Sequence, residues 1–289
     1  MRTQKPFSVV VVVACLLTIF AQAQDKPKLT FKFKNVKVPH ALNTEVWGIN
    51  NFGVMVGPYT SSDGFHHCFK LANGKFTQID DPNGWATQCF GINNHGAIVG
   101  YYIDSSNDRH GFVYAHGKFT DITPPGAEQS WAYGINDKGE ISGTYQGRLP
   151  NPHGFLWDGK TYHTIDVPGS TATGAFGINQ NGVITLFWAR PDGSEEGATY
   201  DGKKYTKIKV FGAANTFTYG INDSLDVAIN WNDAEDVDHG AFLHAGKIYK
   251  IDVPHAVLTD INGVNDRGAV VGSYVPSGSQ MSVGFVATH

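Results

Sequence analysis

The chain has 289 residues and a formal net charge of −4, with 41% hydrophobic and 17% charged residues. A mildly acidic protein is a poor partner for nucleic acid or anionic lipid, because both attract basic patches. We therefore expect no nucleic-acid partner.

The N-terminus predicts an exported protein. Arg2 and Lys5 precede an apolar run over residues 7–20, and the small residues around Ala23 form a cleavage site. The run is shorter than the roughly 20 residues that a membrane-spanning helix needs. We expect a signal peptide over residues 1–23, cleaved after Ala23, and a single domain over residues 24–289. The mature protein is then secreted or periplasmic, without a membrane span.

One tripeptide motif recurs six times behind this segment, at a spacing of 43 residues. Its copies are Gly48-Ile49-Asn50, Gly91-Ile92-Asn93, Gly134-Ile135-Asn136, Gly177-Ile178-Asn179, Gly220-Ile221-Asn222 and Gly263-Val264-Asn265. A strict period of this length is typical of repeat architectures, in which each unit needs its neighbours to bury a core.

Each unit predicts four short β-strands separated by turns. Asparagine followed three residues later by glycine, as at Asn93 and Gly96, is typical of a tight turn. Next come a strand ending in a large aromatic residue, a strand led by histidine, a turn with Gly-Lys, and a last strand ending in Ile-Asp-Val-Pro or a relative. Four strands without helical periodicity predict the blade of a β-propeller.

The two ends of the chain complement each other. The sixth repeat stops after its third strand, at residues 284–286, while residues 36–40 match the end of the fifth repeat at residues 251–255. We therefore predict an all-β, six-bladed propeller with four-stranded blades. The N-terminal strand, at about residues 31–38, completes the last blade and closes the ring, which removes open sheet edges.

The repeat resembles that of the HAF family of bacterial extracellular repeat proteins. The shared pattern is Gly-Ile-Asn-x-x-Gly, Val-Gly-x-Tyr, His-Gly-Phe, Gly-x-Phe and Ile-Asp-x-Pro-Gly, which residues 91–126 carry almost completely. The resemblance covers the whole mature chain, and its departures gather in the fourth and fifth units, where Glu196 replaces the histidine and Leu225 the turn glycine. It implies export and a propeller fold, and it supplies no catalytic residues to carry over.

The recurring polar residues have two interpretations. Four histidines at one phase of the repeat form a ring by symmetry, and imidazoles are common metal ligands. We favour a structural role, because the same buried polar groups must be hydrogen-bonded in every blade. A hydroxyl residue also recurs at one repeat position as a potential partner. The histidines are His67, His110, His153 and His239; the hydroxyl residues are Thr44, Thr87, Ser130, Thr173, Thr216 and Thr259.

The recurring aromatic residues predict packing. Tyr59 and its equivalents end the second strand, and Trp47 and its equivalents precede the Gly-Ile-Asn motif. We expect both sets to fill the gaps between blades, since large rings dominate the packing of such cores.

We expect function on the face that carries the variable loops. If the first strand of each blade is innermost, the second-to-third and fourth-to-first connections share one face, here called the loop face. The tight turns then share the opposite turn face. Exposed aromatic and hydrogen-bonding side chains together suit a glycan or peptide. The candidate ligand-binding residues are Trp85, Trp131, Phe217, Arg109, Arg148 and Arg190.

One loop, at residues 232–238, is dense in carboxylates. Asp233, Glu235, Asp236 and Asp238 offer oxygen ligands of the kind that Ca²⁺ takes, which makes calcium the alternative cofactor. The loop lacks the central glycine and terminal glutamate of a helix–loop–helix calcium site. We favour a solvated loop, with no metal and no cofactor.

The two cysteines that follow the signal segment give no clear prediction. An oxidising compartment permits a disulfide. Cys68 and Cys89 nevertheless lie at unrelated phases of the repeat, so whether they pair is left open.

The sequence favours a binding or interaction module whose ligand is a glycan, peptide or protein. One alternative is a hydrolase or lyase with a metal or carboxylate site at the channel mouth, for which Asp236, Glu195 and Glu196 are the nearest candidates. Another is a passive envelope or matrix component. We lean away from an enzyme, because no Gly-x-Ser-x-Gly or Cys-x-x-Cys motif is present. We expect a monomer.

Overall fold

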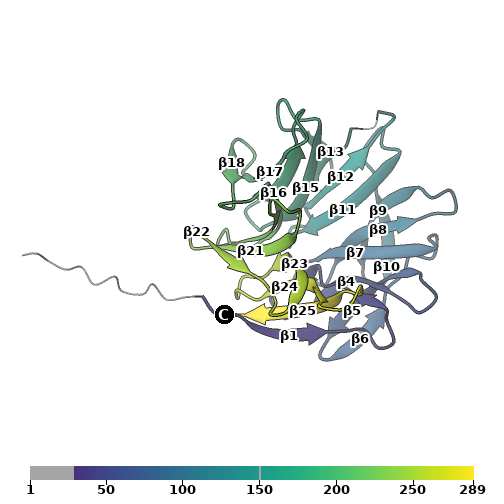
Figure 1. Ribbon diagram of the computed structural model, residues 1–289. Helices are drawn as coiled ribbons and strands as arrows, with labels where there is room; N and C mark the ends of the chain where they lie inside the picture. Colours follow the sequence, from purple (N-terminus) through teal and green to yellow (C-terminus); the bar gives the residue numbers. More distant parts are fainter. Residues whose placement is uncertain (1–28, 150) are drawn as a thin grey trace, which may run out of the picture.

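The computed structural model describes residues 29–149 and 151–289, and these form a six-bladed β-propeller (Figure 1). Six four-stranded antiparallel sheets follow one another around a central axis, so the predicted fold class is confirmed. The predicted signal peptide and its cleavage site lie outside the described residues. Within the described ranges, no helix is long and apolar enough to cross a membrane.

The first three blades use residues 43–165. Blade 1 contains β2 (Asn43–Thr44), β3 (Gly48–Ile49), β4 (Met55–Thr60), β5 (His66–Ala72) and β6 (Lys75–Gln78). Blade 2 contains β7 (Ala86–Ile92), β8 (Ile98–Ile103), β9 (Arg109–Ala115) and β10 (Lys118–Ile122). Blade 3 contains β11 (Gln129–Ile135), β12 (Ile141–Gln146), β13 (His153–Trp157) and β14 (Tyr162–Ile165). In blade 1 the first strand is split into β2 and β3, which both pair with β4.

The last three blades use the rest of the chain. Blade 4 contains β15 (Ala172–Ile178), β16 (Ile184–Ala189), β17 (Glu195–Tyr200) and β18 (Tyr205–Ile208). Blade 5 contains β19 (Asn215–Ile221), β20 (Val227–Asn232), β21 (Asp238–His244) and β22 (Lys247–Ile251). Blade 6 contains β23 (Ala256–Val264), β24 (Val270–Pro276), β25 (Val283–Thr288) and β1 (Lys32–Val36).

The ring is closed by the N-terminal strand, as predicted. β1 pairs antiparallel with β25, from Lys32 opposite Thr288 to Val36 opposite Gly284. Figure 1 shows the two ends of the colour scale side by side in this blade. Closure therefore depends on main-chain hydrogen bonds between the two ends of the chain.

The first strand of each blade is innermost and lines the central channel. The glycine of each Gly-Ile-Asn motif allows neighbouring first strands to come very close: a Cβ on Gly91 would lie 2.6 Å from the Tyr133 carbonyl oxygen. Because this neighbour is backbone, no side-chain movement relieves the clash. Glycine therefore recurs at this repeat position because the backbones of neighbouring first strands approach each other closely at the axis.

The asparagine of the same motif forms a closed ring of hydrogen bonds. Each side-chain amide donates to the carbonyl of the equivalent asparagine in the next blade at 3.0–3.1 Å, from Asn50 to Asn93 and onward until Asn265 donates to Asn50. Its side-chain oxygen accepts from its own turn, as when Asn93 accepts from the Ala97 amide. One residue type thus both caps the turn and joins the blades.

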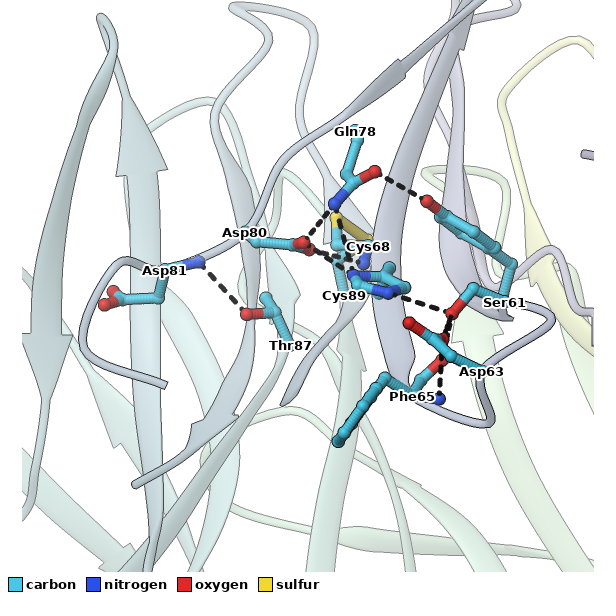
Figure 2. Close-up of polar contacts among 11 residues, drawn as sticks. Ser61, Asp63, Phe65, Cys68, Gln78, Asp80, Asp81, Thr87 and Cys89 are labelled. Atoms are coloured by element: carbon cyan, nitrogen blue, oxygen red, sulfur yellow. Dashed lines mark hydrogen bonds and ion pairs between the residues drawn. A yellow bond between two sulfur atoms is a disulfide. The ribbon is translucent and has the colours of Figure 1, made fainter. Parts of the chain in front are cut away.

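The cores lie between adjacent sheets. Five phenylalanines of the third strands are almost completely buried there; they are Phe69, Phe112, Phe155, Phe242 and Phe285. Cys68 and Cys89 form a disulfide between β5 and β7, which links blade 1 to blade 2 (Figure 2). Three-dimensional packing thus answers the question of pairing that the sequence leaves open.

Candidate functional site

The recurring histidines pair with carboxylates. His67 lies 2.7 Å from Asp80, and His153 lies 3.0 Å from Asp166. His110 lies 3.0 Å from Asp104 instead, and in its blade Thr123 takes the position of Asp80 and Asp166. His239 meets both types of partner, Asp233 and Asp252. His67 and His239 therefore join the second-to-third loop to the end of the last strand, since His67 also contacts Ser61 in that loop. His110 reaches only the loop, and His153 only the end of the last strand.

The recurring hydroxyls have a different role from the predicted one. They are not the partners of the histidines; the five threonines each accept a hydrogen bond from a backbone amide of the preceding connection. Ser130 accepts from the Gly111 amide in β9 instead, because Pro124 at the equivalent position has no N–H. Thr87 accepts from Asp81 at 3.0 Å, as Figure 2 shows, and Thr259 accepts from Val253 at 3.0 Å. In the five blades with threonine, the hydroxyl thereby fixes the loop that enters the first strand.

The recurring aromatic residues confirm the packing expectation in part, because Tyr102 and Trp231 belong to buried clusters that span two blades. Tyr59, Tyr102, Tyr145 and Trp231 each lie opposite the histidine of their own blade, with ring centroids 4.5–5.3 Å apart. The set that precedes Gly-Ile-Asn lines the channel instead and forms a chain of ring contacts: Trp47, Phe90, Tyr133, Phe176 and Tyr219. Asn262 takes the sixth place, and Trp47 and Tyr219 contact each other across it at 5.6 Å.

The acidic loop at residues 232–238 is held by its own hydrogen bonds. Asp233 accepts from the Val237 and Glu235 amides and pairs with His239, and Asp236 accepts from Asn232. In the described part of the chain, no three histidine, cysteine or acidic side chains are arranged to hold a metal ion.

A cavity of about 300 Å³ opens between blades 3 and 4 on the loop face. Its position follows from its lining residues: Pro152 precedes β13, Ala172 begins β15, Ala189 ends β16 and Glu195 begins β17. All four positions lie where these strands meet the loop face. The walls are mainly aromatic, and the rings belong to Trp131, Tyr133, Phe176, Phe187 and Trp188.

The cavity exists because two small residues replace large ones. Thr144 in β12 takes the repeat position that Tyr101 and Phe187 fill in the neighbouring blades. Gly174 in β15 takes the position of Trp131 and Phe217. At this interface, therefore, both sides lack the rings that pair at the two flanking interfaces, Tyr101 with Trp131 and Phe187 with Phe217.

Two polar groups in the cavity wall lack ordinary partners. The Thr144 hydroxyl is buried and makes no hydrogen bond within the described residues. The Glu195 side chain is half-buried, and desolvation raises its pKa. A buried hydroxyl without a partner is costly, so a ligand group that satisfies it gains binding energy.

The structure separates the six predicted ligand-binding residues. Trp131 lines the cavity, and the Arg109 guanidinium lies 6.0 Å from its ring while donating to Gln129. Phe217 packs on Phe187 next to the cavity. The remaining three lie apart from it: Trp85 is 46% exposed against Phe65, Arg148 is exposed, and Arg190 pairs with Glu196.

The loop-face mouth of the channel carries a second group of titratable residues that sequence reasoning missed. Asp260 and Glu45 occupy the same repeat position in adjacent blades 6 and 1. Each directly follows the recurring hydroxyl residue of its blade. Burial, with Asp238 and Glu45 nearby, raises the pKa of Asp260 to about 7. The signal was available in the alignment of the repeats, where the equivalent residues in the other blades are not acidic.

No family model and no curated protein matches the chain. Solved structures do resemble it. The lectin of Aleuria aurantia, a six-bladed β-propeller, is 13% identical with a TM-score of 0.51, covering 85% of this chain and 91% of that one. The SapL1 lectin with α-methyl fucoside is 10% identical with a TM-score of 0.56, covering 86% and 94%. Virginiamycin B lyase of Staphylococcus aureus is 12% identical with a TM-score of 0.51, covering 90% and 100%. At these identities the likeness shows the fold.

Proposed function

We propose that this protein binds carbohydrate on its loop face, with one sugar unit in the cavity between blades 3 and 4. The observation that carries the proposal is the cavity itself. Its aromatic walls suit the C–H face of a sugar ring, and the Thr144 hydroxyl and Glu195 carboxylate supply hydrogen-bonding groups beside them. Its volume lies at the lower end of small-molecule sites, which fits a single sugar unit.

The structural neighbours agree with this class of ligand. Two of them are lectins, one with a fucose recognition mode and the other in complex with α-methyl fucoside, and that property belongs to those proteins. For this chain we extend only the broader class, carbohydrate. We further propose that it is an exported monomer related to the HAF repeat proteins.

The proposal is tested by a glycan array followed by calorimetric titration of the glycans that bind. Replacing Thr144 by Tyr refills the cavity with the side chain that blade 2 carries at this position, and we expect it to abolish binding. Trp131→Ala removes one wall and should have a similar effect. Trp85→Ala is the matched control, because Trp85 is an exposed loop-face tryptophan outside the cavity.

Unchanged glycan binding by Thr144→Tyr would contradict the assignment of the cavity. Near-UV circular dichroism should show that the variant keeps its fold. Loss of binding by Trp85→Ala alone would move the site to the rim between blades 1 and 2, where Trp85 meets Phe65.

A second candidate is a hydrolase or lyase at the channel mouth. The specific observation is Asp260, whose pKa of about 7 lets it hold a proton near neutral pH beside the carboxyl group of Glu45. Cleavage of a bound glycan that disappears in Asp260→Asn, and that declines above pH 7 in the wild type, is the expected result for this candidate. Stable glycans after prolonged incubation would exclude them as its substrates.

A further inference from the structure

The charge of the cavity wall selects among sugars. Glu195 is the only lining side chain with a formal charge, and the other lining residues are aromatic, small or apolar, or carry a hydroxyl. The shape of the cavity thus admits a sugar unit, while its single carboxylate distinguishes between neutral and positively charged ones.

Glu195 has no counterion of its own. Its neighbour Glu196 holds both nearby cations, Arg190 at 3.0 Å and Lys207 at 2.7 Å. In the described part of the chain, no lysine, arginine or histidine pairs with the Glu195 carboxylate. Desolvation without a compensating cation disfavours the charged form of this group. A cationic ligand therefore provides the counterion that Glu195 does not receive from the protein.

Two tryptophan rings near the ends of β16 and β20 already lie close to lysine ammonium groups in this protein. The Lys250 ammonium lies 3.7 Å from the centre of the Trp231 ring, and the Lys207 ammonium lies 5.5 Å from the Trp188 ring. The cavity brings further ring faces together beside an unpaired carboxylate. A site that combines several aromatic ring faces with one carboxylate is suited to bind an ammonium group.

The surroundings add to this preference. The carboxylates of Asp260, Glu195 and Asp238 all disfavour ionisation of the Tyr219 phenol, whose pKa desolvation raises. Glu195 and Asp238 belong to the neighbouring blades 4 and 5, while Asp260 in blade 6, with a pKa of about 7, is mostly neutral below pH 7, so the negative field beside the cavity comes from the first two. Such a field raises the local concentration of cationic ligands.

We infer that the cavity is selective for a sugar with a free ammonium group, that is, an amino sugar that is not acetylated. The inference rests on the proposed carbohydrate-binding function. The ammonium group pairs with Glu195 between the aromatic walls, and the Thr144 hydroxyl oxygen accepts a hydrogen bond from an N–H or O–H of the sugar.

The experiment compares two probes of equal length, the β-1,4-linked tetramer of glucosamine and the tetramer of N-acetylglucosamine, by isothermal titration calorimetry below pH 7. We expect the glucosamine tetramer to bind about tenfold more tightly or better. Glu195→Gln keeps the shape of the cavity and should remove this preference. Thr144→Tyr should abolish binding of both probes, and Trp85→Ala should change neither.

Equal or tighter binding of the acetylated tetramer overturns the inference, as does an unchanged preference in Glu195→Gln. If a neutral glycan binds and Thr144→Tyr abolishes that binding, the proposed function holds while the selectivity for ammonium fails. If Thr144→Tyr binds every glycan as the wild type does, both proposals fail. Thr144→Val, which keeps the volume and removes the hydroxyl, separates the polar contribution from the steric one.

Discussion

Glu196 accepts a hydrogen bond from Arg190 at 3.0 Å at the place in blade 4 where His239 meets Asp233 in blade 5. The third position of the cluster is exchanged too, since Lys209 occupies the place of Asp252. Blade 5 therefore has a histidine between two carboxylates, where blade 4 has a carboxylate beside cationic side chains. The charges are exchanged while the link between loop and strand is kept, which identifies the recurring histidine as a structural element.

We therefore predict that reversing one charge alone destabilises its blade. His239→Glu places a carboxylate between Asp233 and Asp252, and we expect a loss of about 1 kcal/mol in the free energy of unfolding at pH 7. Urea denaturation measures it. His239→Gln, which removes the ring without adding a charge, should cost less. An equal loss in the two variants would mean that the ring stack on Trp231, which both variants lack, outweighs the added charge.

The disulfide between Cys68 and Cys89 should stabilise the first interface between blades. It closes a loop of sequence separation 21, for which restriction of the unfolded chain predicts about 3 kcal/mol. We expect the Cys68→Ser/Cys89→Ser variant to unfold at lower urea concentration, and wild type with reductant to match it. Titration of thiols in the denatured mature protein should find none free; two reactive thiols would contradict the pairing.

The asparagine ring should be among the most sensitive features of the fold. Asn93→Asp keeps the oxygen that caps the turn but loses the N–H that donates to the Asn136 carbonyl at 3.0 Å. Because Asn93 is buried, we expect a loss of about 2 kcal/mol or more. Phe52→Ser, at an exposed site on the same face, serves as control and should leave the denaturation midpoint unchanged.

Asp260 predicts a specific pH dependence of stability. Its pKa rises from the ordinary 3.8 to about 7 in the folded protein, so the folded state holds this proton more tightly than the unfolded state. Its stabilising contribution is complete below about pH 4 and is lost as the pH rises to 7. Asp260→Asn should therefore gain stability relative to wild type between pH 4 and 7, by at most about 4 kcal/mol. Parallel curves for the two proteins across this range would refute the shift.

The sequence by itself determined the fold. The period of 43 residues, the turn signal at Asn93 and Gly96, and the match between residues 36–40 and 251–255 were enough to predict six blades closed by the N-terminal strand. This succeeded because a repeat shows the same local solution six times, so that turn chemistry and strand pattern reinforce one another.

Tertiary structure alone decided the partners of the recurring side chains. His67 pairs with Asp80, thirteen residues away, while Thr87 accepts from the backbone; both groups recur at a fixed phase, so spacing cannot distinguish these arrangements. The bond between Cys68 and Cys89 was hidden for a related reason. Residues at different phases of the repeat come together only across the interface between two blades, whose register no single repeat contains.

The cavity could be located only from the tertiary structure, although the two small residues that open it are visible in the sequence. Thr144 and Gly174 are each unremarkable as small residues in a strand. They open a site only because packing places them opposite each other between two blades, with the Thr144 hydroxyl 3.4 Å from where a Cβ on Gly174 would lie. The repeat pattern thus determined the scaffold, and the meeting of two small residues, Thr144 and Gly174, at one interface determined where the cavity opens.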